Sequence, residues 1–426
     1  TVKKENEILE FLKSSNIDTF IIALDEHEIF DKHKYIKILY DFNISIIIFD
    51  KDNNYSNLSN KIDIGSLLFR NQNHSKINLN YENKTILVTG GAGSIGTEIT
   101  KQLIFNNAKK IIILDNSEYN LFLLNNVINE IKSKIPFKTL LSVHLCDISI
   151  ADDIEKIIKN YSIDYVYHCA AYKHVPIVEK NIDISLKNNF FNTHSLLSYC
   201  ISKKIKNFTL ISSDKAVRPT NIMGATKRLA ELSCLYLNKF KNIETKVSIV
   251  RFGNVLESSG SVVPIFKNQI LNGGPVTVTD PQITRYFMSL EEASLLVLQS
   301  SLMGSGGEIY LLDMGEPIKI LELAKKMIRL SGRSIKSTNS KSGDIEIIFT
   351  GLKKGEKIFE ELLIDHNSKK TTNKFIYQSI ENDIDSKAYE KLHNDIVNYY
   401  EKSNEIDFNQ ILKNKMIGYN GQQSNI

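Results

Sequence analysis

The stretch TILVTGGAGSIGTEITKQLIFNNAKKIIILD, residues 85–115, decides the fold. An apolar run at 85–90 predicts a buried strand, and a helical pattern at 94–106 follows a turn rich in glycine. A second apolar run, at 110–115, predicts the next strand. Strand, glycine turn, helix and strand in this order are typical of an α/β unit with parallel strands.

The glycine turn predicts a dinucleotide site. Gly90, Gly93 and Gly96 have the spacing G-x-x-G-x-x-G, and the turn joins a strand to a helix. Glycines let the backbone approach a pyrophosphate, which the N–H groups at the helix start bind, those of Ser94 and Ile95 among them. A glycine motif alone is weak evidence, and its place between strand and helix gives it weight.

Residues at later strand ends indicate the rest of this site. Asp115 ends the second strand, where a carboxylate accepts the ribose hydroxyls of NAD and repels the extra phosphate of NADP. No Arg or Lys follows it directly, so NAD is favoured; the alternative is that Asp115 caps the next helix. Asp147 and Ile148 could hold the adenine, and Ala170 lets a cofactor lie close, whereas His168 is interpreted as a core residue.

Alternating strands and helices continue to about residue 255 and predict a Rossmann-type, doubly wound parallel sheet. Beyond that point shorter elements suit a lobe that closes over a substrate. We therefore expect a small N-terminal α/β domain at 1–75, an NAD-binding domain at 76–255, and mainly a substrate-binding lobe with C-terminal helices at 256–426.

The first 75 residues carry no glycine-rich turn, so we interpret them as a structural or docking domain without a nucleotide. Apolar runs predict strands at 18–24 and 44–50, and helical patterns occupy 5–16 and 34–42.

The composition excludes several classes of protein. The net charge is +4 with 42% hydrophobic residues, which favours a packed core and gives no argument for nucleic acid as a partner. The four cysteines form no C-x-x-C pair and no zinc pattern, which indicates a reduced, cytosolic protein without a metal. No apolar run reaches the roughly 20 residues of a membrane span. The chain begins at Thr1 rather than Met, so a membrane segment upstream remains compatible with the sequence.

The chemical site is expected where the strand at 207–213 ends. Ser213, Asp214 and Lys215 are adjacent, and they can reach one substrate only if the strand has ended and the chain turns, which Pro219 favours. A surface ion pair is the simpler alternative, but the position after an apolar strand favours a functional role.

Six motifs occur in one order: GGAGSIG, AAYKHVPIVE, SSDKAVRPTNIMGATKR, RFGNVLESSGSVVP, DPQITRYFMSLEEA and GLKKGEKIFEELL. Together they resemble the UDP-N-acetylglucosamine 4,6-dehydratases of the extended short-chain dehydrogenase superfamily. Within that group the chain is most similar to large, membrane-anchored members that begin the bacterial pathway to bacillosamine-type sugars. The likeness covers residues 70 to 365, and the first 70 resemble the domain that such members carry after their membrane helices.

The resemblance implies a redox-neutral reaction. NAD takes hydride from carbon 4 of the sugar, water leaves from carbons 5 and 6, and the hydride returns to carbon 6. Asp214 would protonate the leaving hydroxyl, Lys215 would be the base at carbon 5, and Lys227 would hold the nicotinamide ribose. An acid and a base on one substrate are what an elimination needs.

Met223 departs from the family pattern, because most relatives carry there the Tyr that deprotonates the hydroxyl on carbon 4. Some bacillosamine-pathway members have Met at this place. A thioether cannot accept the proton and fills space instead. We expect the Ser213 hydroxyl to relay the proton to water or to Asp214.

The resemblance also implies groups for a UDP-sugar. Ser258, Ser259 and Gly260 stand where close relatives read Ser-Arg-Gly, so one cationic contact is absent. The substrate-binding residues implied are Lys173, Asn254, Lys267, Arg285 and Glu356.

Two alternatives remain open at this stage. One is a UDP-sugar 4-epimerase, although such an enzyme relies on the Tyr that is absent here. The other is a non-catalytic nucleotide-binding scaffold, which Met223 would suggest. The resemblance further implies a homodimer or larger oligomer through two helices, one of them starting near Gly224. It places the full-length protein at the cytoplasmic side of the inner membrane.

Overall fold

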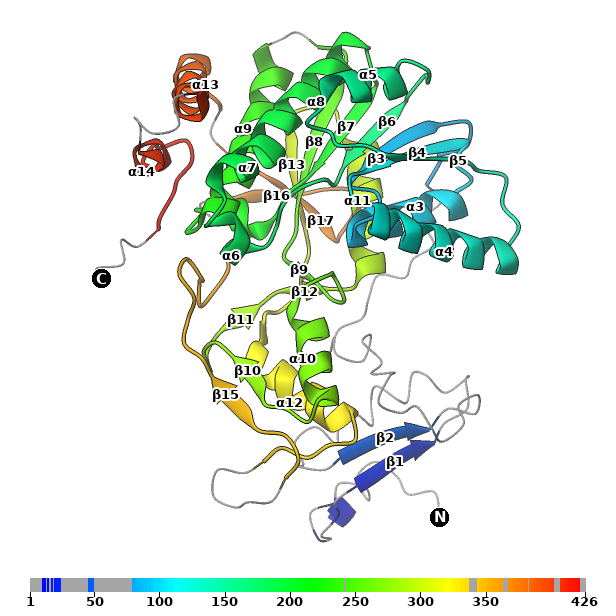
Figure 1. The fold of residues 1–426 in the computed structure, drawn as a ribbon, viewed down its shortest axis with the longest axis vertical. Coiled ribbons are helices and arrows are strands. Elements are labelled where there is room, and N and C mark those ends of the chain that lie inside the picture. The colour runs from blue at the N-terminus through cyan, green and yellow to red at the C-terminus, as the bar shows by residue number, and fades with distance from the viewer. Residues whose placement is uncertain are drawn as a thin grey trace. The chain divides into compact units, whose positions relative to one another are not determined.

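The computed structural model shows an α/β fold built on a nine-stranded sheet (Figure 1). It describes residues 10–12, 14, 17, 19–23, 45–49, 79–240, 243–336, 343–362, 367–381, 383–401 and 407–421. Contacts within the chain divide it into two units. The smaller unit comprises Thr1–Gln72, Gly260–Ser289 and Gly315–Lys353, and the larger comprises Asn73–Ser259, Leu290–Met314 and Lys354–Ile426. The predicted three-part division by sequence stays a proposal.

Seven parallel strands form most of the sheet, in the order β5-β4-β3-β6-β7-β8-β13. The order reverses beside β3, since β4 and β5 extend the sheet to one side and β6, β7, β8 and β13 to the other. This confirms the doubly wound fold, and it makes the carboxyl ends of β3 and β6 a topological switch point, where ligands bind in such sheets. The strands are β3 (Thr85–Thr89), β4 (Lys110–Asp115), β5 (Leu140–Leu145), β6 (Tyr165–His168), β7 (Asn207–Ile211), β8 (Lys246–Arg251) and β13 (Glu308–Leu312).

Two antiparallel strands at one edge correct the prediction of a wholly parallel sheet. β17 (Ile376–Ser379) pairs antiparallel with β13, and β16 (Ser368–Lys370) pairs antiparallel with β17. β16 reads Ser-Lys-Lys and is exposed throughout, so no apolar run could reveal it. An antiparallel edge on a parallel sheet is common in this fold class. Three strands therefore come from the segment beyond residue 255, which we expected to form mainly a substrate lobe.

Helices cover both faces of the sheet (Figure 1). α3 packs against α11, which also contacts β7 and β8, and α8 packs against α9. The helices are α3 (Ser94–Phe105), α4 (Glu118–Lys134), α5 (Ala151–Ile158), α6 (Val175–Val178), α7 (Ile182–Leu186), the π-helical η4 (Lys187–Phe191), α8 (Asn192–Ser202), the 3₁₀ turn η5 (Asp214–Ala216), α9 (Ile222–Phe240) and α11 (Leu290–Met303).

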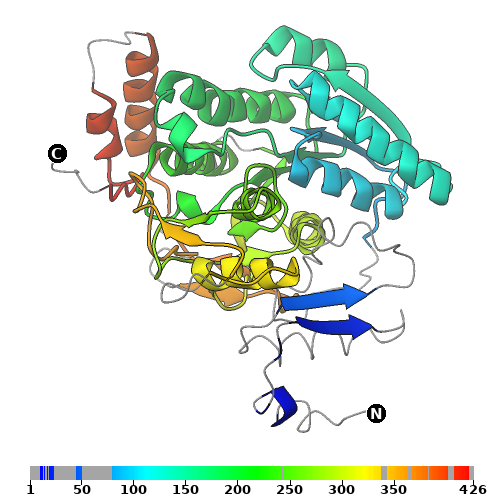
Figure 2. The ribbon, with the colours of Figure 1, turned by 60° about the horizontal axis from the view of Figure 1, so that its bottom comes forward.

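The chain's own C-terminal segment covers α9. Fifteen of the nineteen residues of α9 are buried. α13 (Ser386–Glu401) packs on α9, and α14 (Phe408–Leu412) packs on α13 (Figure 2). Tyr389 of α13 stacks on Tyr236 of α9 with ring centroids 4.4 Å apart. The homodimer through this helix stays a proposal.

The smaller unit holds short strands and two helices that pack together. β10 pairs in parallel with β15, and β11 pairs antiparallel with β14. Beyond residue 255 its described elements are α10 (Val262–Leu271), β10 (Val276–Val278), β11 (Thr284–Arg285), β12 (Phe287–Met288), β14 (Ile318–Lys319), α12 (Ile320–Leu330) and β15 (Ile347–Phe349); β9 (Asn254–Val255) belongs to the larger unit.

Both strands expected near the N-terminus are present, as β1 (Thr19–Ala23) and β2 (Ser45–Phe49), and they pair in parallel. Residues 10–12 and 14 of the first expected helix are helical. The rest of that helix and the helix expected at 34–42 lie outside the described residues.

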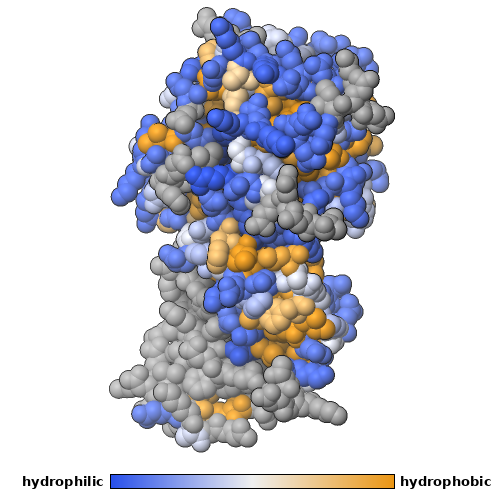
Figure 3. Space-filling model, turned by 90° about the vertical axis from the view of Figure 1, so that its left-hand side faces the viewer, coloured by the Kyte–Doolittle hydropathy of each residue, from blue (hydrophilic) through white to orange (hydrophobic). Residues whose placement is uncertain are grey.

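Hydrophilic residues predominate on the upper part of the face drawn in Figure 3, with smaller apolar areas between them. Within the described ranges, no helix combines the length and the apolar character needed to cross a membrane.

Candidate active site

The glycine turn is shaped by close contact with the end of β6. Gly90 has a positive φ of 61°, and a Cβ there would lie 2.6 Å from the backbone nitrogen of Ala170. A Cβ on Gly96 would lie 2.3 Å from the Gly90 carbonyl oxygen. Gly93 is the N-cap of α3, so Ser94 and Ile95 occupy the first turn, where N–H groups are available to an anion. Side chains are thus excluded where a pyrophosphate would approach.

A cavity of about 190 Å³ opens beside this turn and brings together five of the predicted cofactor residues, Gly90, Gly93, Asp115, Ile148 and Ala170. It is smaller than the roughly 300–1,000 Å³ of typical ligand pockets, and it suits part of a dinucleotide. The sequence did not identify the rest of its lining: Leu114, Asn116, Asn120, Cys146, Cys169, Ala171, Tyr172 and Asn188.

The alternative that Asp115 caps the next helix is wrong, because Ser117 is the N-cap of α4 and its hydroxyl accepts the N–H of Asn120 at 3.3 Å. Asp115 instead accepts two other backbone N–H groups. Its Oδ1 accepts the N–H of Ser117 at 3.0 Å. Its Oδ2 accepts the N–H of Ala92 in the glycine turn at 3.0 Å, and the residue also lines the cavity. Asp147 turns its carboxylate to the N–H of Ser149 at 2.8 Å, while its neighbour Ile148 lines the cavity.

His168 is a core residue, as expected. The ring is 1% exposed and lies between the hydroxyls of Thr89 and Thr193, at 2.7 and 2.9 Å. Burial, with Lys227 nearby, lowers the pKa of His168 to about 3, so the ring is neutral at physiological pH.

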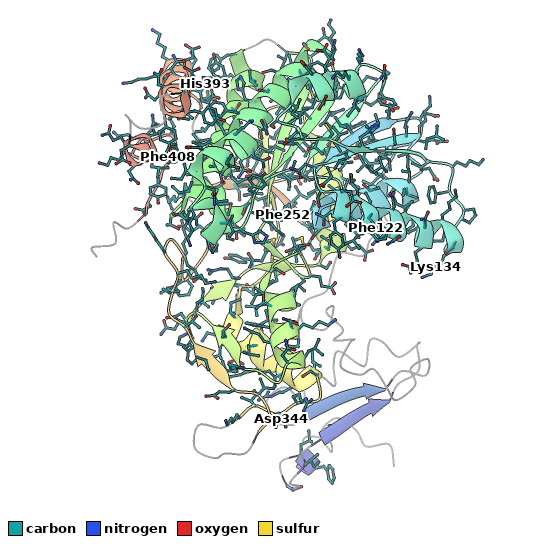
Figure 4. All side chains as sticks on the ribbon, in the orientation of Figure 1. Phe122, Lys134, Phe252, Asp344, His393 and Phe408 are labelled. Carbon is teal, nitrogen blue, oxygen red and sulfur yellow. The ribbon has the colours of Figure 1, made fainter. Side chains whose placement is uncertain are left out.

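The candidate catalytic segment, residues 213–215, turns where the sequence requires it. β7 ends at Ile211, and η5 begins at Asp214 with Ser213 as its N-cap. The Ser213 hydroxyl accepts the N–H of Lys215 at 3.2 Å and donates to Asp214 Oδ1 at 2.9 Å. The N–H of Asp214 donates to the carbonyl of Phe252, labelled in Figure 4, at 3.1 Å, which ties η5 to the chain after β8. Hydroxyl, carboxylate and amine therefore lie together.

The Lys215 amine lies among three oxygen acceptors. Its Nζ is 3.0 Å from Asp214 Oδ1, 3.3 Å from Asn254 Oδ1 and 3.5 Å from Glu360 Oε1. The Asp214 side chain is 1% exposed, and its Oδ2 accepts no hydrogen bond from the part of the chain that the structure describes. Such a buried, unsatisfied oxygen is costly unless a further group, such as a substrate hydroxyl, completes it.

Lys227 is buried behind this pair. Its Nζ donates to the carbonyl oxygen of Ile211, the last residue of β7, at 2.5 Å. Burial lowers the pKa of Lys227 to about 8, although Glu231 acts in the opposite direction. Met223, one turn earlier on α9, is 3% exposed and packs in the apolar core, consistent with a space-filling role.

The predicted substrate residues are distributed over both units. Asn254 contacts Lys215, whereas Lys173 is exposed. Glu356 lies half-buried in a segment whose Gly355 carbonyl accepts the Thr220 hydroxyl at 2.9 Å. Lys267 on α10 and Arg285 on β11 belong to the smaller unit; Arg285 is 7% exposed and donates from Nη1 to the Thr284 carbonyl at 2.7 Å.

The sequence did not single out Glu360 as a site residue. Its side chain is 4% exposed and contacts Lys215. The signal was present, because the motif GLKKGEKIFEELL carries two acidic residues besides the selected Glu356, namely Glu360 and Glu361. The sequence alone could not show which of them turns inward.

Ser259 contacts the glycine turn. The N–H of Ser259 donates to Ser94 Oγ at 3.0 Å, so the Ser258-Ser259-Gly260 loop contacts the start of α3. Among the described residues, no group of three or more His, Cys, Asp or Glu side chains is arranged to hold a metal ion.

The fold and these contacts define a class: a Rossmann-like α/β protein of the epimerase and dehydratase kind. The structure of Pen from Bacillus thuringiensis is similar, with a TM-score of 0.62 and 33% identity over 75% of this chain and 99% of that one. DesIV, a dTDP-glucose 4,6-dehydratase from Streptomyces venezuelae solved with NAD, shares the fold at a TM-score of 0.50 and 21% identity, over 57% and 80% of the two chains.

The chain belongs to the polysaccharide biosynthesis protein family, which matches residues 86–381. It is 43% identical to the capsular polysaccharide biosynthesis protein CapD of Staphylococcus aureus over 71% of this chain, and it spans about half of that relative, 49%. It is 42% identical to an uncharacterized membrane protein, MJ1061, of Methanocaldococcus jannaschii, over 67% and 82% of the two chains. A UDP-glucose 4-epimerase of Rickettsia rickettsii is 32% identical, over 66% and 78%.

Proposed function

We propose that the chain catalyses the NAD-dependent 4,6-dehydration of UDP-N-acetylglucosamine to a UDP-4-keto-6-deoxy-N-acetylhexosamine. The observation that carries the proposal is the contact of Asp214 with Lys215 at 3.0 Å, at the carboxyl end of β7. An elimination needs an acid and a base on one substrate. A carboxyl group and an amine in contact can exchange one proton and so provide both forms.

The cofactor site fits NAD. The glycine turn leaves room for a pyrophosphate, and Asp115 lines the cavity in which a ribose would lie. Bound NAD would supply the hydride acceptor for carbon 4 and the hydride donor for carbon 6. That DesIV was solved with NAD supports this choice.

The protein groups divide the elimination between them. The Lys215 amine removes the proton on carbon 5, the bonding electrons form the carbon 5–carbon 6 double bond, and the hydroxyl leaves as water with a proton from Asp214. The unsatisfied Oδ2 of Asp214 is the oxygen available to that hydroxyl. Asn254, beside Lys215, would orient the sugar.

Ser213 is the candidate for the first proton transfer, since Met223 cannot accept a proton. The Ser213 hydroxyl already donates to Asp214 at 2.9 Å, which gives a path from the oxygen on carbon 4 to that carboxylate. Lys227 would hold the nicotinamide ribose, and its amine donates to the carbonyl oxygen of Ile211, two residues before Ser213.

The wider assignment rests on the family resemblance. Lys173, Lys267, Arg285 and Glu356 would bind the UDP part. The product would enter synthesis of bacillosamine-type sugars for protein glycosylation or surface polysaccharide. A homo-oligomer and an anchor on the cytoplasmic side of the inner membrane belong to the same proposal; the printed name of MJ1061, a membrane protein, supports the anchor.

A UDP-sugar 4-epimerase is the second candidate, favoured by the 32% identity to the Rickettsia rickettsii protein. Epimerisation needs no acid–base pair at the end of β7, so the buried Asp214 argues for dehydration. A non-catalytic scaffold would have no use for that costly carboxylate.

Incubation with UDP-N-acetylglucosamine in deuterated water, followed by NMR of the product, tests the proposal. Dehydration gives a 4-keto-6-deoxy sugar with deuterium at carbon 5. The galacto epimer would establish the epimerase instead, and unchanged substrate with bound NAD would establish the scaffold.

A further inference from the structure

We infer that Glu360 is a positioning residue for Lys215: its buried carboxylate is the fixed counter-charge for the ammonium that forms when Lys215 takes the proton from carbon 5. The inference rests on the proposed dehydration. Glu360 Oε1 lies 3.5 Å from Lys215 Nζ, and its side chain is 4% exposed.

The surroundings of the amine match its charged form. An ammonium has three N–H donors, and three oxygens, from Asp214, Asn254 and Glu360, lie around Nζ at 3.0, 3.3 and 3.5 Å. Preorganised groups of this kind act where charge develops in the transition state, and they act strongly where water is excluded. The site therefore favours the state that Lys215 reaches by acting as a base.

Asp214 cannot be the constant counter-charge. As the acid for the leaving hydroxyl it begins the elimination protonated and becomes a carboxylate only as its proton departs. Asn254 carries no charge. Glu360 contacts the same amine and can stay negative from the start to the end of the step.

Other residues of the 354–362 segment pair with the loop after η5. Glu361 pairs with Arg218 at 2.7 Å and with Lys357 at 3.6 Å, and Lys357 also donates to the Val217 carbonyl at 3.1 Å. These contacts join the 354–362 segment to the loop after η5. Glu360, in the same segment, contacts the Lys215 amine at 3.5 Å.

Glu360→Gln, compared with the matched Glu361→Gln, tests this by single turnovers with UDP-N-acetylglucosamine. Two quantities are followed: absorbance of reduced nicotinamide, and deuterium entering carbon 5 from the solvent. With Glu360→Gln we expect reduced nicotinamide to form at the wild-type rate and then to persist, because deuterium incorporation slows on the order of 10²-fold. Glu361→Gln weakens the contacts of the same segment with Arg218 and Lys357, so any slowing should affect both steps alike, whereas Glu360→Asp should restore part of the rate.

Equal slowing of both steps, or of neither, in Glu360→Gln would overturn the inference while leaving the dehydratase assignment intact. Wild-type protein that makes no dehydrated product would overturn both. Thermal midpoints of all three variants show whether any of them has lost its fold. If Glu360→Gln has, the rates of the two steps in Glu360→Asp decide whether the inference holds.

Discussion

The Arg251 guanidinium binds the Glu231 carboxylate through two hydrogen bonds, from Nε at 2.7 Å and from Nη2 at 2.6 Å, and both side chains are fully buried. Glu231 also accepts the Ser212 hydroxyl at 2.6 Å, one residue before Ser213. Burial would raise the pKa of Glu231, but Arg251 and then Arg228 outweigh it and hold this pKa below its ordinary value. The ion pair therefore connects α9 and β8 to the catalytic segment.

Replacing Glu231 by Gln should destabilise the fold by ~3–5 kcal/mol, because it leaves the Arg251 charge buried without its full counter-charge. Urea unfolding measures the loss. Glu244→Gln is the control, since Glu244 pairs with Lys204 on the surface with both side chains 73% exposed, and no measurable change is expected. Equal stability of the two variants would show that the buried pair contributes nothing.

Asp214→Asn should lower kcat on the order of 10²–10⁴-fold, since an amide cannot protonate the leaving hydroxyl. NAD affinity should stay at the wild-type value, because Asp214 does not line the cofactor cavity. Turnover with UDP-N-acetylglucosamine and NAD titration are measured on the same preparation. Full turnover by Asp214→Asn would place the acid elsewhere.

Lys227 should make stability depend on pH in alkaline solution. Its pKa is lowered by burial from 10.5 to about 8, so between these values the native state binds fewer protons than the unfolded state. Stability then rises with pH across this window, by up to ~3 kcal/mol, and this contribution is lost as the pH falls through 8.

Lys227→Met removes the titrating amine with little change in volume. The difference in free energy of unfolding between wild type and Lys227→Met should therefore change between pH 8 and 10.5 in favour of the wild type as the pH rises. A difference that is constant with pH would show that Lys227 keeps its ordinary pKa in the folded protein.

The sequence predicted what local pattern determines. Apolar runs located strands such as β3, β4 and β7, and the glycine spacing located the turn that touches Ala170. It could not predict contacts between distant segments. β16 has no apolar residue, and its place depends on pairing with β17, whose own place depends on β13, more than sixty residues before it in the chain.

The candidate site shows the same limit. Adjacent residues such as Ser213, Asp214 and Lys215 were identified because they are local. Glu360 and Lys215 are 145 positions apart in the sequence (360 less 215), and only the folded chain brings them into contact. Asn116 and Asn120 line the cavity because α4 begins beside β4. The type of these residues does not predict that position.

Gly90→Ala should abolish NAD binding. It should also destabilise the fold more than Gly273→Ala, in which the new methyl group causes backbone strain but no clash. Gly90 has φ of 61° and a Cβ would lie 2.6 Å from the Ala170 nitrogen, so the turn must move away from β6. Gly273, with φ of 83° and no heavy atom within 4 Å of a Cβ, is the matched control. Gly273→Ala should cost about 1 kcal/mol from strain alone and leave NAD binding unchanged. Calorimetric titration with NAD and thermal unfolding measure both effects, and equal losses in the two variants would mean that strain, not the approach to Ala170, governs the turn.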